Sequence, residues 1–232
     1  SGIPLDKYQE AFIQHFSAVN PGWQDWCVKE LRGHGPHPAP QGSQFGQTYY
    51  VFWNFFAHSP YVTAKGQRRF YVESGANHWA HLSNTLFFDK CLGWEGLCIE
   101  PTAAYHENLK TKRSCKLVPE LVSAKRMGLA YTDNGAFGHV SAARENQSHV
   151  VSARPLAAML AELNRSHVDF WSLDVEGHEL QVLKGVDWMS LTFNTILIED
   201  FHIDRHHLDY IMTRNGQRKY LQLGHDSLYY SK

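Results

Sequence analysis

The chain has 232 residues, of which 43% are hydrophobic, and this is enough for one domain with a complete core. Its formal net charge is −1, so the protein has no overall field that would attract nucleic acid or an anionic membrane surface, and we expect neither as a partner. No apolar run approaches the roughly 20 residues that span a bilayer, and the sequence contains no secretory signal.

The first 66 residues are expected to form a helical and loop extension ahead of the core. Tyr8, Phe12 and Phe16 recur every four residues, which predicts a helix that packs on the core. Residues 33–46 are rich in Gly, Pro and His and predict a loop that can fold over a ligand. The aromatic run at residues 49–56 is interpreted as a helix or strand buried against the sheet, in preference to a platform that stacks on sugars.

The most informative stretch begins with a strand and a glycine turn. Residues 70–72 have the aromatic and β-branched side chains of a buried strand, and Gly75 lets the chain turn sharply and approach a ligand. The helix expected at residues 83–91 presents free N–H groups at its start. A second strand, residues 97–99, is closed by Glu100, 25 residues after Gly75. Doubly wound folds place the carboxylate that holds a ribose at a similar spacing of ~20 residues.

The turn lacks the full G-x-G-x-x-G pattern, because Gly75 is followed by Ala76, Asn77 and His78. A pyrophosphate cradle is therefore poorly supported, which counts against an NAD-type oxidoreductase. A cofactor with a ribose and no phosphate, such as S-adenosylmethionine, needs only the turn and the acid. By spacing alone, this interpretation and an ordinary glycine turn followed by an unrelated acid are equally supported.

Helical and strand patterns alternate in the rest of the chain. Helices are expected at residues 102–112, 155–163 and 179–183, and strands at 117–122, 168–173, 195–198, 220–223 and 227–230. Residues 127–131 and 136–140 flank Asn134-Gly135, which is a strong hairpin signal. This order predicts an α/β fold with a mainly parallel seven-stranded sheet, helices on both faces and an antiparallel edge strand.

Each core strand is followed by a polar or acidic residue, and these residues are Glu73, Glu100, Ser123, Asp174 and Glu199. In open α/β sheets, ligands bind outside the carboxyl ends of the strands. Carboxylates are rarely buried unless they are paired or functional. A whole edge of them therefore favours a binding site over a set of helix caps.

Several specific blocks lie along the chain in a fixed order: SQFGQ (43–47), SGAN (74–77), SNTLFFDKCLGWEGLCIEP (83–101), Tyr105, RSC (113–115), SLDVEGHELQVLKGVDW (172–188) and ILIE (196–199). In content and order they resemble the FkbM family of S-adenosylmethionine-dependent methyltransferases. Two positions depart from the family pattern. Glu73 and Thr48 stand where the family usually has Asp, and the change at Thr48 removes a carboxylate.

The resemblance implies a class I, Rossmann-like O-methyltransferase core over residues 67–232, with S-adenosylmethionine as its cofactor. It also implies that Gln44 and Gln47, in the SQFGQ block, are lid residues. A hydroxyl of a sugar or glycoconjugate is the expected acceptor. The alternatives are a natural-product or peptide acceptor, and a catalytically silent module that only binds the cofactor.

The residues expected to bind the cofactor are Glu73, Gly75, Ala76, Asn77, Ser83, Asn84, Glu100, Pro101, Tyr105, Ser123 and Asp174. Glu100 should hold the ribose and the Gly75 turn the methionine end. Ser83 and Asn84, at the helix start, should bind the cofactor carboxylate. Tyr105 is expected either to cover the adenine or to pack its own helix.

The candidates for the catalytic base lie in the sequence DVEGHE. They are Asp174 at the strand tip, and Glu176 and His178 in the turn that follows. His178 has the pKa suited to neutral pH. The resemblance favours Asp174 and Glu176, because His178 occupies a variable position of the family's motif.

A second mechanism uses a divalent metal, Mg²⁺ or Mn²⁺, bound by Asp174, Glu199 and Asp200. Such an ion would bind a sugar diol and acidify one hydroxyl. The alternative is that these acids bind substrate hydroxyls directly or cap the helix that follows.

The four cysteines, Cys27, Cys91, Cys98 and Cys115, show no C-x-x-C spacing, and three of them lie in apolar patterns. Free buried thiols are therefore favoured over disulfides or a zinc site. We expect a cytoplasmic location, with an upstream anchor and a Golgi location as the alternative because the chain starts at Ser1 without Met. The expected partner is a small-molecule or glycan acceptor.

Overall fold

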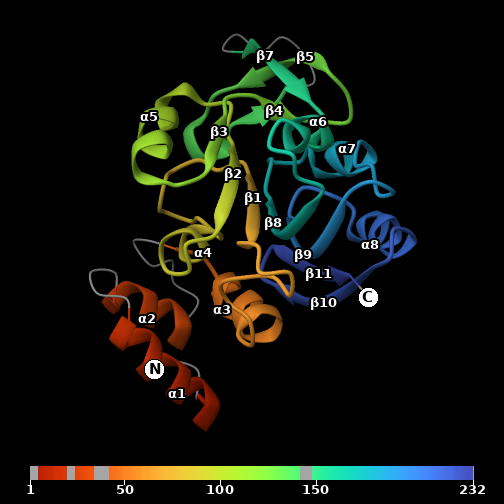
Figure 1. Ribbon diagram of the computed structural model, residues 1–232. Helices are drawn as coiled ribbons and strands as arrows, with labels where there is room; N and C mark the ends of the chain where they lie inside the picture. Colours follow the sequence, from red (N-terminus) through yellow and green to blue (C-terminus); the bar gives the residue numbers. More distant parts are fainter. Residues whose placement is uncertain (1–4, 20–23, 34–41, 142–147, 232) are drawn as a thin grey trace.

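A seven-stranded sheet forms the centre of the molecule (Figure 1). The structure is a computed structural model and describes residues 5–19, 24–33, 42–141 and 148–231. The strand order is β10-β11-β9-β8-β1-β2-β3. These strands are β1 (Phe70–Ser74), β2 (Glu95–Ile99), β3 (Lys116–Val118), β8 (His167–Leu173), β9 (Thr192–Glu199), β10 (Gln217–Leu223) and β11 (Asp226–Ser231).

The sheet is mixed. β1 pairs in parallel with β2 and β8, and the parallel pairing continues to β3 on one side and β9 on the other. β11 runs antiparallel to both β9 and β10, so the edge strand β10 pairs antiparallel, as predicted, and β11 lies second from the edge. Burial explains the placement, because Leu228 and Tyr229 of β11 are fully buried whereas most of β10 is not.

A second, four-stranded sheet has the order β4-β7-β5-β6. Its strands are β4 (Leu121–Val122), β5 (Met127–Thr132), β6 (His139–Val140) and β7 (Ser148–Arg154). The hairpin predicted around Asn134-Gly135 is confirmed, since β5 and β6 pair antiparallel on either side of a 3₁₀ turn, Gly135–Phe137. The single strand predicted at residues 117–122 was wrong: it is divided between the two sheets at Pro119, which cannot donate a hydrogen bond to a ladder.

Helices cover both faces of the main sheet. One face packs on α6 (Leu156–Ala161), α7 (Glu179–Lys184) and α8 (Arg205–Arg214). The other face packs on α1 (Lys7–Val19), α2 (Gln24–Arg32), α3 (Gln47–Val51), α4 (Leu86–Lys90) and α5 (Ala103–Lys112). Among the described residues, no helix combines the length and the apolar character that crossing a bilayer requires.

The N-terminal extension shares its core with the sheet. Phe16, Leu31 and Phe52 are buried in one cluster with Tyr71 of β1 and Phe170 of β8. The aromatic run at residues 49–56 is helical, as one of the two alternatives predicted, and continues from α3 into a π-helical turn. Most of the loop expected at residues 33–46 lies outside the described ranges, since these resume at residue 42.

Two disulfides join segments that are distant in sequence, so the prediction of free thiols was wrong. Cys27 of α2 pairs with Cys91 after α4, and Cys98 of β2 pairs with Cys115 ahead of β3. The sequence separations are 64 and 17 residues. Spacing rules could not find these pairs, because the fold alone brings the partners together.

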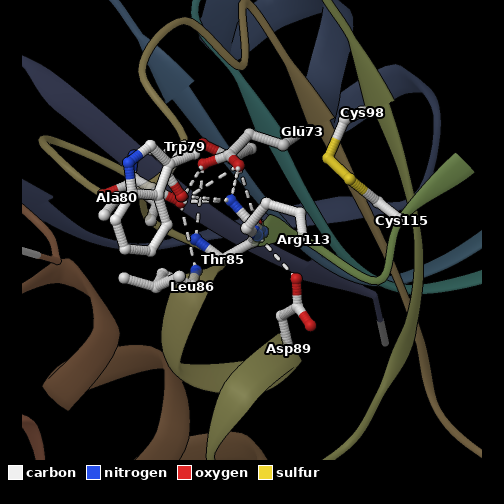
Figure 2. Close-up of polar contacts among 12 residues, drawn as sticks. Glu73, Trp79, Ala80, Thr85, Leu86, Asp89, Cys98, Arg113 and Cys115 are labelled. Carbon is white, nitrogen blue, oxygen red and sulfur yellow. Dashed lines mark hydrogen bonds and ion pairs between the residues drawn. A yellow bond between two sulfur atoms is a disulfide. The ribbon is translucent and has the colours of Figure 1, made fainter. Parts of the chain in front are cut away.

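A fully buried guanidinium, that of Arg113 after α5, joins the end of β1 to the start of α4 (Figure 2). Its Nε donates to Asp89 at 2.5 Å and its Nη1 to Glu73 at 3.1 Å. Its Nη2 donates to the hydroxyls of Tyr71 and Thr85. Burial opposes the ionisation of Asp89, but the charge of Arg113 and a bond from Ser114 lower the pKa of this carboxyl below its ordinary value.

We expect Arg113→Leu to lower the free energy of unfolding by about 3–5 kcal/mol, because it removes the buried cation that pairs with Glu73 and Asp89 and leaves Asp89 only Lys90, at 3.9 Å, among the described residues. Urea unfolding followed by tryptophan fluorescence measures the change. Arg32→Gln is the control, since Arg32 pairs with Glu10 in solvent and its loss should cost about 1 kcal/mol or less. Equal losses for the two variants would contradict the account.

Candidate active site

A cleft of about 410 Å³ opens at the carboxyl ends of β1, β2, β8 and β9. The strand order reverses at β1, with β2 and β3 on one side of it and β8 and β9 on the other. The cleft lies at this switch point, where α/β folds bind ligands. The loops of the second sheet form one wall, with Tyr131 and Phe137 in the lining. The cleft therefore receives side chains from segments spread over most of the chain.

Most of the residues predicted from the sequence meet in this cleft. Its lining includes Glu73, Gly75, Ala76, Asn77, Asn84, Glu100, Pro101, Asp174, Glu176 and Glu199. Gln44 also lines the cleft, as expected for a lid residue. Gln47 is buried beneath it, where its Nε2 donates to Asp226 at 2.7 Å.

Gly75 occupies a position that a side chain cannot share. Its φ is +76°, and a Cβ atom there would lie 1.8 Å from the carbonyl oxygen of Asp174. The backbone N–H groups of Gly75 and Ala76 both donate to the carbonyl of Ile99. The turn is thus held between the ends of β2 and β8, and it exposes backbone to the cleft.

Glu100 is held rigidly in the lining of the cleft. Its two carboxylate oxygens accept bonds of 2.7 Å from the backbone N–H groups of Asn77 and Thr102. Burial raises the pKa of this carboxyl, although the bonds from Thr102 and Asn77 oppose the shift. The remaining lone pairs of the two oxygens can accept hydroxyls of a ligand.

Glu73 lines the cleft, but its carboxylate is already engaged. It accepts bonds from the hydroxyls of Ser83 and Thr85 and from Arg113. Ser83 lies outside the lining, and its Oγ also accepts the N–H of Leu86 at the start of α4. Both residues therefore fix the helix start, and neither has a free polar group for a ligand.

Asn84, between Ser83 and Thr85, does have a free polar group. Its Nδ2 donates to the hydroxyl of Ser172 at 3.1 Å. Its Oδ1 is buried and has no hydrogen-bond partner in the part of the chain that the structure describes. A buried acceptor without a partner is costly, so this oxygen is suited to a donor group of a ligand.

Acidic side chains crowd the other half of the cleft. Burial and the charge of Glu199 raise the pKa of Asp174 well above its ordinary value. Burial, with the negative charges of Glu176 and Glu179, raises the pKa of Glu199 to about 8. Burial raises the pKa of Glu176, and this shift is opposed by His202, whose Nε2 lies 3.4 Å from the Oε2 of Glu176, and by His139.

Besides Gln47 and Ser83, four predicted residues lie outside the lining: Tyr105, Ser123, His178 and Asp200. His178 and Ser123 contact each other, with 3.0 Å between Nε2 and Oγ, and burial lowers the pKa of His178. Tyr105 packs against the core cluster that contains the N-terminal helices. The fold thus places His178 away from the two acids that precede it in the motif.

Asp200 was predicted as a metal ligand with Asp174 and Glu199, but the structure does not group it with them. Its carboxylate accepts bonds from Arg205, Gln222 and Ser227. The reason is geometric: successive residues of a strand point to opposite sides, so Glu199 and the residue after it cannot both face the cleft.

Sequence reasoning missed the aromatic side chains at the cleft. Phe137 and Phe201 line it and are 68% and 58% exposed. Phe201 stacks edge-on against His202 and His225, with ring centroids 4.7 and 4.5 Å apart. The available signal was the position of Phe201, directly after the acids that close β9.

We expect Gly75→Ala to lower the free energy of unfolding by more than about 2 kcal/mol, because it adds a backbone clash to the cost of about 1–2 kcal/mol for a left-handed residue. Gly66→Ala is the matched control. Gly66 has a φ of +74° but nothing within 4 Å of its would-be Cβ. Urea unfolding of both variants isolates the clash, and equal losses would exclude it.

Comparison with solved structures gives distant similarities, of which three have TM-scores of 0.44 to 0.48. A methyltransferase FkbM from Methylobacillus flagellatus KT is 15% identical with a TM-score of 0.44; the match covers 96% of this chain and 58% of that one. The N-terminal domain of human METTL16 in complex with SAH is 13% identical with a TM-score of 0.48, covering 94% and 82%. A human methyltransferase 10 domain containing protein is 13% identical with a TM-score of 0.47, covering 99% of each chain.

The chain spans 58% of the length of the Methylobacillus protein. No curated protein matches the sequence. The model of the Methyltransferase FkbM domain, however, matches residues 73–219, which is more than half of the chain and contains both strand ends and the acidic motif described above. The resemblance inferred from the sequence is therefore confirmed, and the chain belongs to the FkbM methyltransferase family.

Proposed function

We propose that the protein transfers a methyl group from S-adenosylmethionine to a hydroxyl of a sugar or glycoconjugate. The observation that carries the proposal is the division of one cleft into two halves. One half combines the Gly75 turn, the fixed carboxylate of Glu100 and the free acceptor of Asn84. The other half combines carboxylates with exposed aromatic rings.

The first half fits the cofactor. Glu100 would accept the ribose hydroxyls, as the acid after the second strand does in doubly wound folds. The backbone at residues 75–77 and the free Oδ1 of Asn84 would bind the methionine end of the cofactor. The Oδ1 would accept a hydrogen bond from the ammonium group of that end. The engaged carboxylate of Glu73 supports this arrangement by fixing the segment that carries Asn84.

The second half fits a polyhydroxylated acceptor. Asp174, Glu176 and Glu199 can accept hydroxyl protons, while Phe137 and Phe201 offer apolar faces to a sugar ring. A natural-product or peptide hydroxyl could use the same groups, so these remain the alternative acceptors. Membership of the family does not by itself identify the acceptor.

When bound, S-adenosylmethionine supplies a methyl group on a positively charged sulfur. The chain's own residues must align the acceptor oxygen with that methyl group and remove the hydroxyl proton. Asp174 and Glu199 are the base candidates that the cleft favours, because burial and neighbouring carboxylates raise the pKa of both, that of Glu199 to about 8, so each holds a proton more readily than an ordinary carboxylate. His178 is a weaker candidate, since its ring faces Ser123 outside the lining.

The two disulfides bear on location. Structural disulfides form and persist in oxidising compartments and are rare in the cytosol. Of the two locations considered from the sequence, the pairs Cys27–Cys91 and Cys98–Cys115 favour the secretory route over the cytoplasm.

We expect Glu100→Gln to weaken the binding of S-adenosylmethionine and its demethylated product about tenfold or more, because charge-assisted bonds to both ribose hydroxyls are lost. Isothermal titration calorimetry measures the affinity, and the unfolding midpoint confirms that the fold is intact. Glu107→Gln, an exposed change on α5, should bind normally. Unchanged affinity in Glu100→Gln would refute the ribose role.

The acceptor class is tested with labelled S-adenosylmethionine and three panels: glycans, natural-product alcohols and peptides. We expect label transfer to glycans, and a lower kcat in Asp174→Asn with unchanged affinity for the demethylated cofactor, since the amide cannot take a proton. Transfer confined to another panel would exclude sugars as the acceptor. Cofactor binding without transfer to any panel would favour a silent binding module.

A further inference from the structure

The acidic half of the cleft carries more negative charge than its neighbours balance. One carboxylate oxygen each of Asp174, Glu179 and Glu199 lies within 4.8 Å of the others. Ligand atoms of Glu176, Glu199 and His202 form a second such group. Glu199 belongs to both groups, so the five side chains converge on one region of the cleft.

Glu179 points into this region with an oxygen that no protein group satisfies. The residue is 0% exposed at the start of α7. Its Oε1 accepts the backbone N–H groups of Val175 and Gly177, whereas its Oε2 has no partner among the described residues. The Oε2 of Glu199 is likewise buried and without a partner there.

The ion pairs that Lys and Arg side chains form among the described residues are with carboxylates other than Asp174, Glu179 and Glu199. Arg205 pairs with Asp200, and within the described ranges no Lys or Arg forms an ion pair with Asp174, Glu179 or Glu199. Buried carboxylates in such numbers require protons or a bound cation. The unsatisfied oxygens of Glu179 and Glu199 favour a cation, because an ion can use both at once.

We propose that Asp174, Glu179 and Glu199, with Glu176 and His202 at the cleft side, bind a divalent cation of the Mg²⁺ and Mn²⁺ class. Carboxylate oxygens are the ligands that these hard cations prefer, and four of the five side chains are carboxylates. This set retains Asp174 and Glu199 from the three ligands expected from the sequence. In place of Asp200 it has Glu176 and Glu179 of the acidic motif and His202 after β9.

The site deepens the proposed function and rests on it for its role. Asp174, Glu176, Glu199 and His202 line the same cleft as the cofactor half. A cation held by them would face the acceptor, where it would bind neighbouring hydroxyl oxygens and favour loss of the proton from one of them. With the cation bound, Asp174 and Glu199 would act as its ligands and not as the base. A vicinal diol is the acceptor chemistry that such an ion selects.

The test measures binding of Mn²⁺ to the full chain by electron paramagnetic resonance, in which bound ions lose the signal of the free ion. We expect saturable binding of one ion per chain, weakened about tenfold or more in Glu179→Gln and in Glu199→Gln. The amide of Glu179→Gln keeps the oxygen that accepts the two backbone bonds, so the fold should survive. Glu107→Gln, which also removes one negative charge, should bind as the parent does.

Absence of saturable binding in the parent, or binding in both variants as tight as in the parent, would overturn the proposal and leave protons to neutralise the cluster. Calorimetry with S-adenosylhomocysteine in the presence of a chelator separates this result from failure of the proposed function. Cofactor binding without Mn²⁺ binding removes only the metal site. Mn²⁺ binding without cofactor binding removes the methyl-transfer role and keeps the metal site.

Discussion

The buried ion cluster around Arg113 is the constraint on which the cleft depends. Taking a guanidinium and two carboxylates out of water is costly, and the arrangement is stable only because each nitrogen has an acceptor. The acceptors belong to β1, to the segment before α4 and to α4 itself (Figure 2). The cluster therefore fixes the spatial relation between the first strand and the helix start that carries Asn84.

The two halves of the cleft differ in how completely their polar groups are satisfied. On the side of Glu100, Glu73 and Glu100 accept several protein hydrogen bonds, and the buried oxygen of Asn84 is the exception. On the acidic side, carboxylates face one another, and burial together with their mutual repulsion raises the pKa of Asp174 and Glu199. A rigid, prearranged half thus lies beside a half that gains stability when positive charge arrives.

Local patterns in the sequence predict the frame of this site well. The strand, the Gly75 turn and Glu100 follow from side-chain type and spacing, because each depends on backbone conformation within a few residues. The alternation of elements likewise predicts the parallel strands β1, β2, β8 and β9 of the main sheet. The position of Asp174 at a strand tip is visible in the same way.

Features that depend on contacts between distant segments could not be predicted. The disulfides, the placement of β11 and the partners of Glu73 all require the folded chain. Asp200 illustrates the limit most clearly: its type and position suited a metal ligand, yet the pleat turns it toward Arg205 and Ser227. Spacing identifies which residues reach an edge of the sheet, and packing decides which of them face the ligand.

The helices before β1 supply part of the cover for one face of the sheet. Phe16, Phe52 and Phe56 pack there with Tyr71 and Phe88, and Cys27 ties α2 to the segment after α4. The region that matches the family begins only at Glu73, so this cover lies outside it. A gene fusion that joined a foreign segment at that boundary would leave the aromatic face bare. The upstream helices and the family core therefore share one hydrophobic core and stabilise each other.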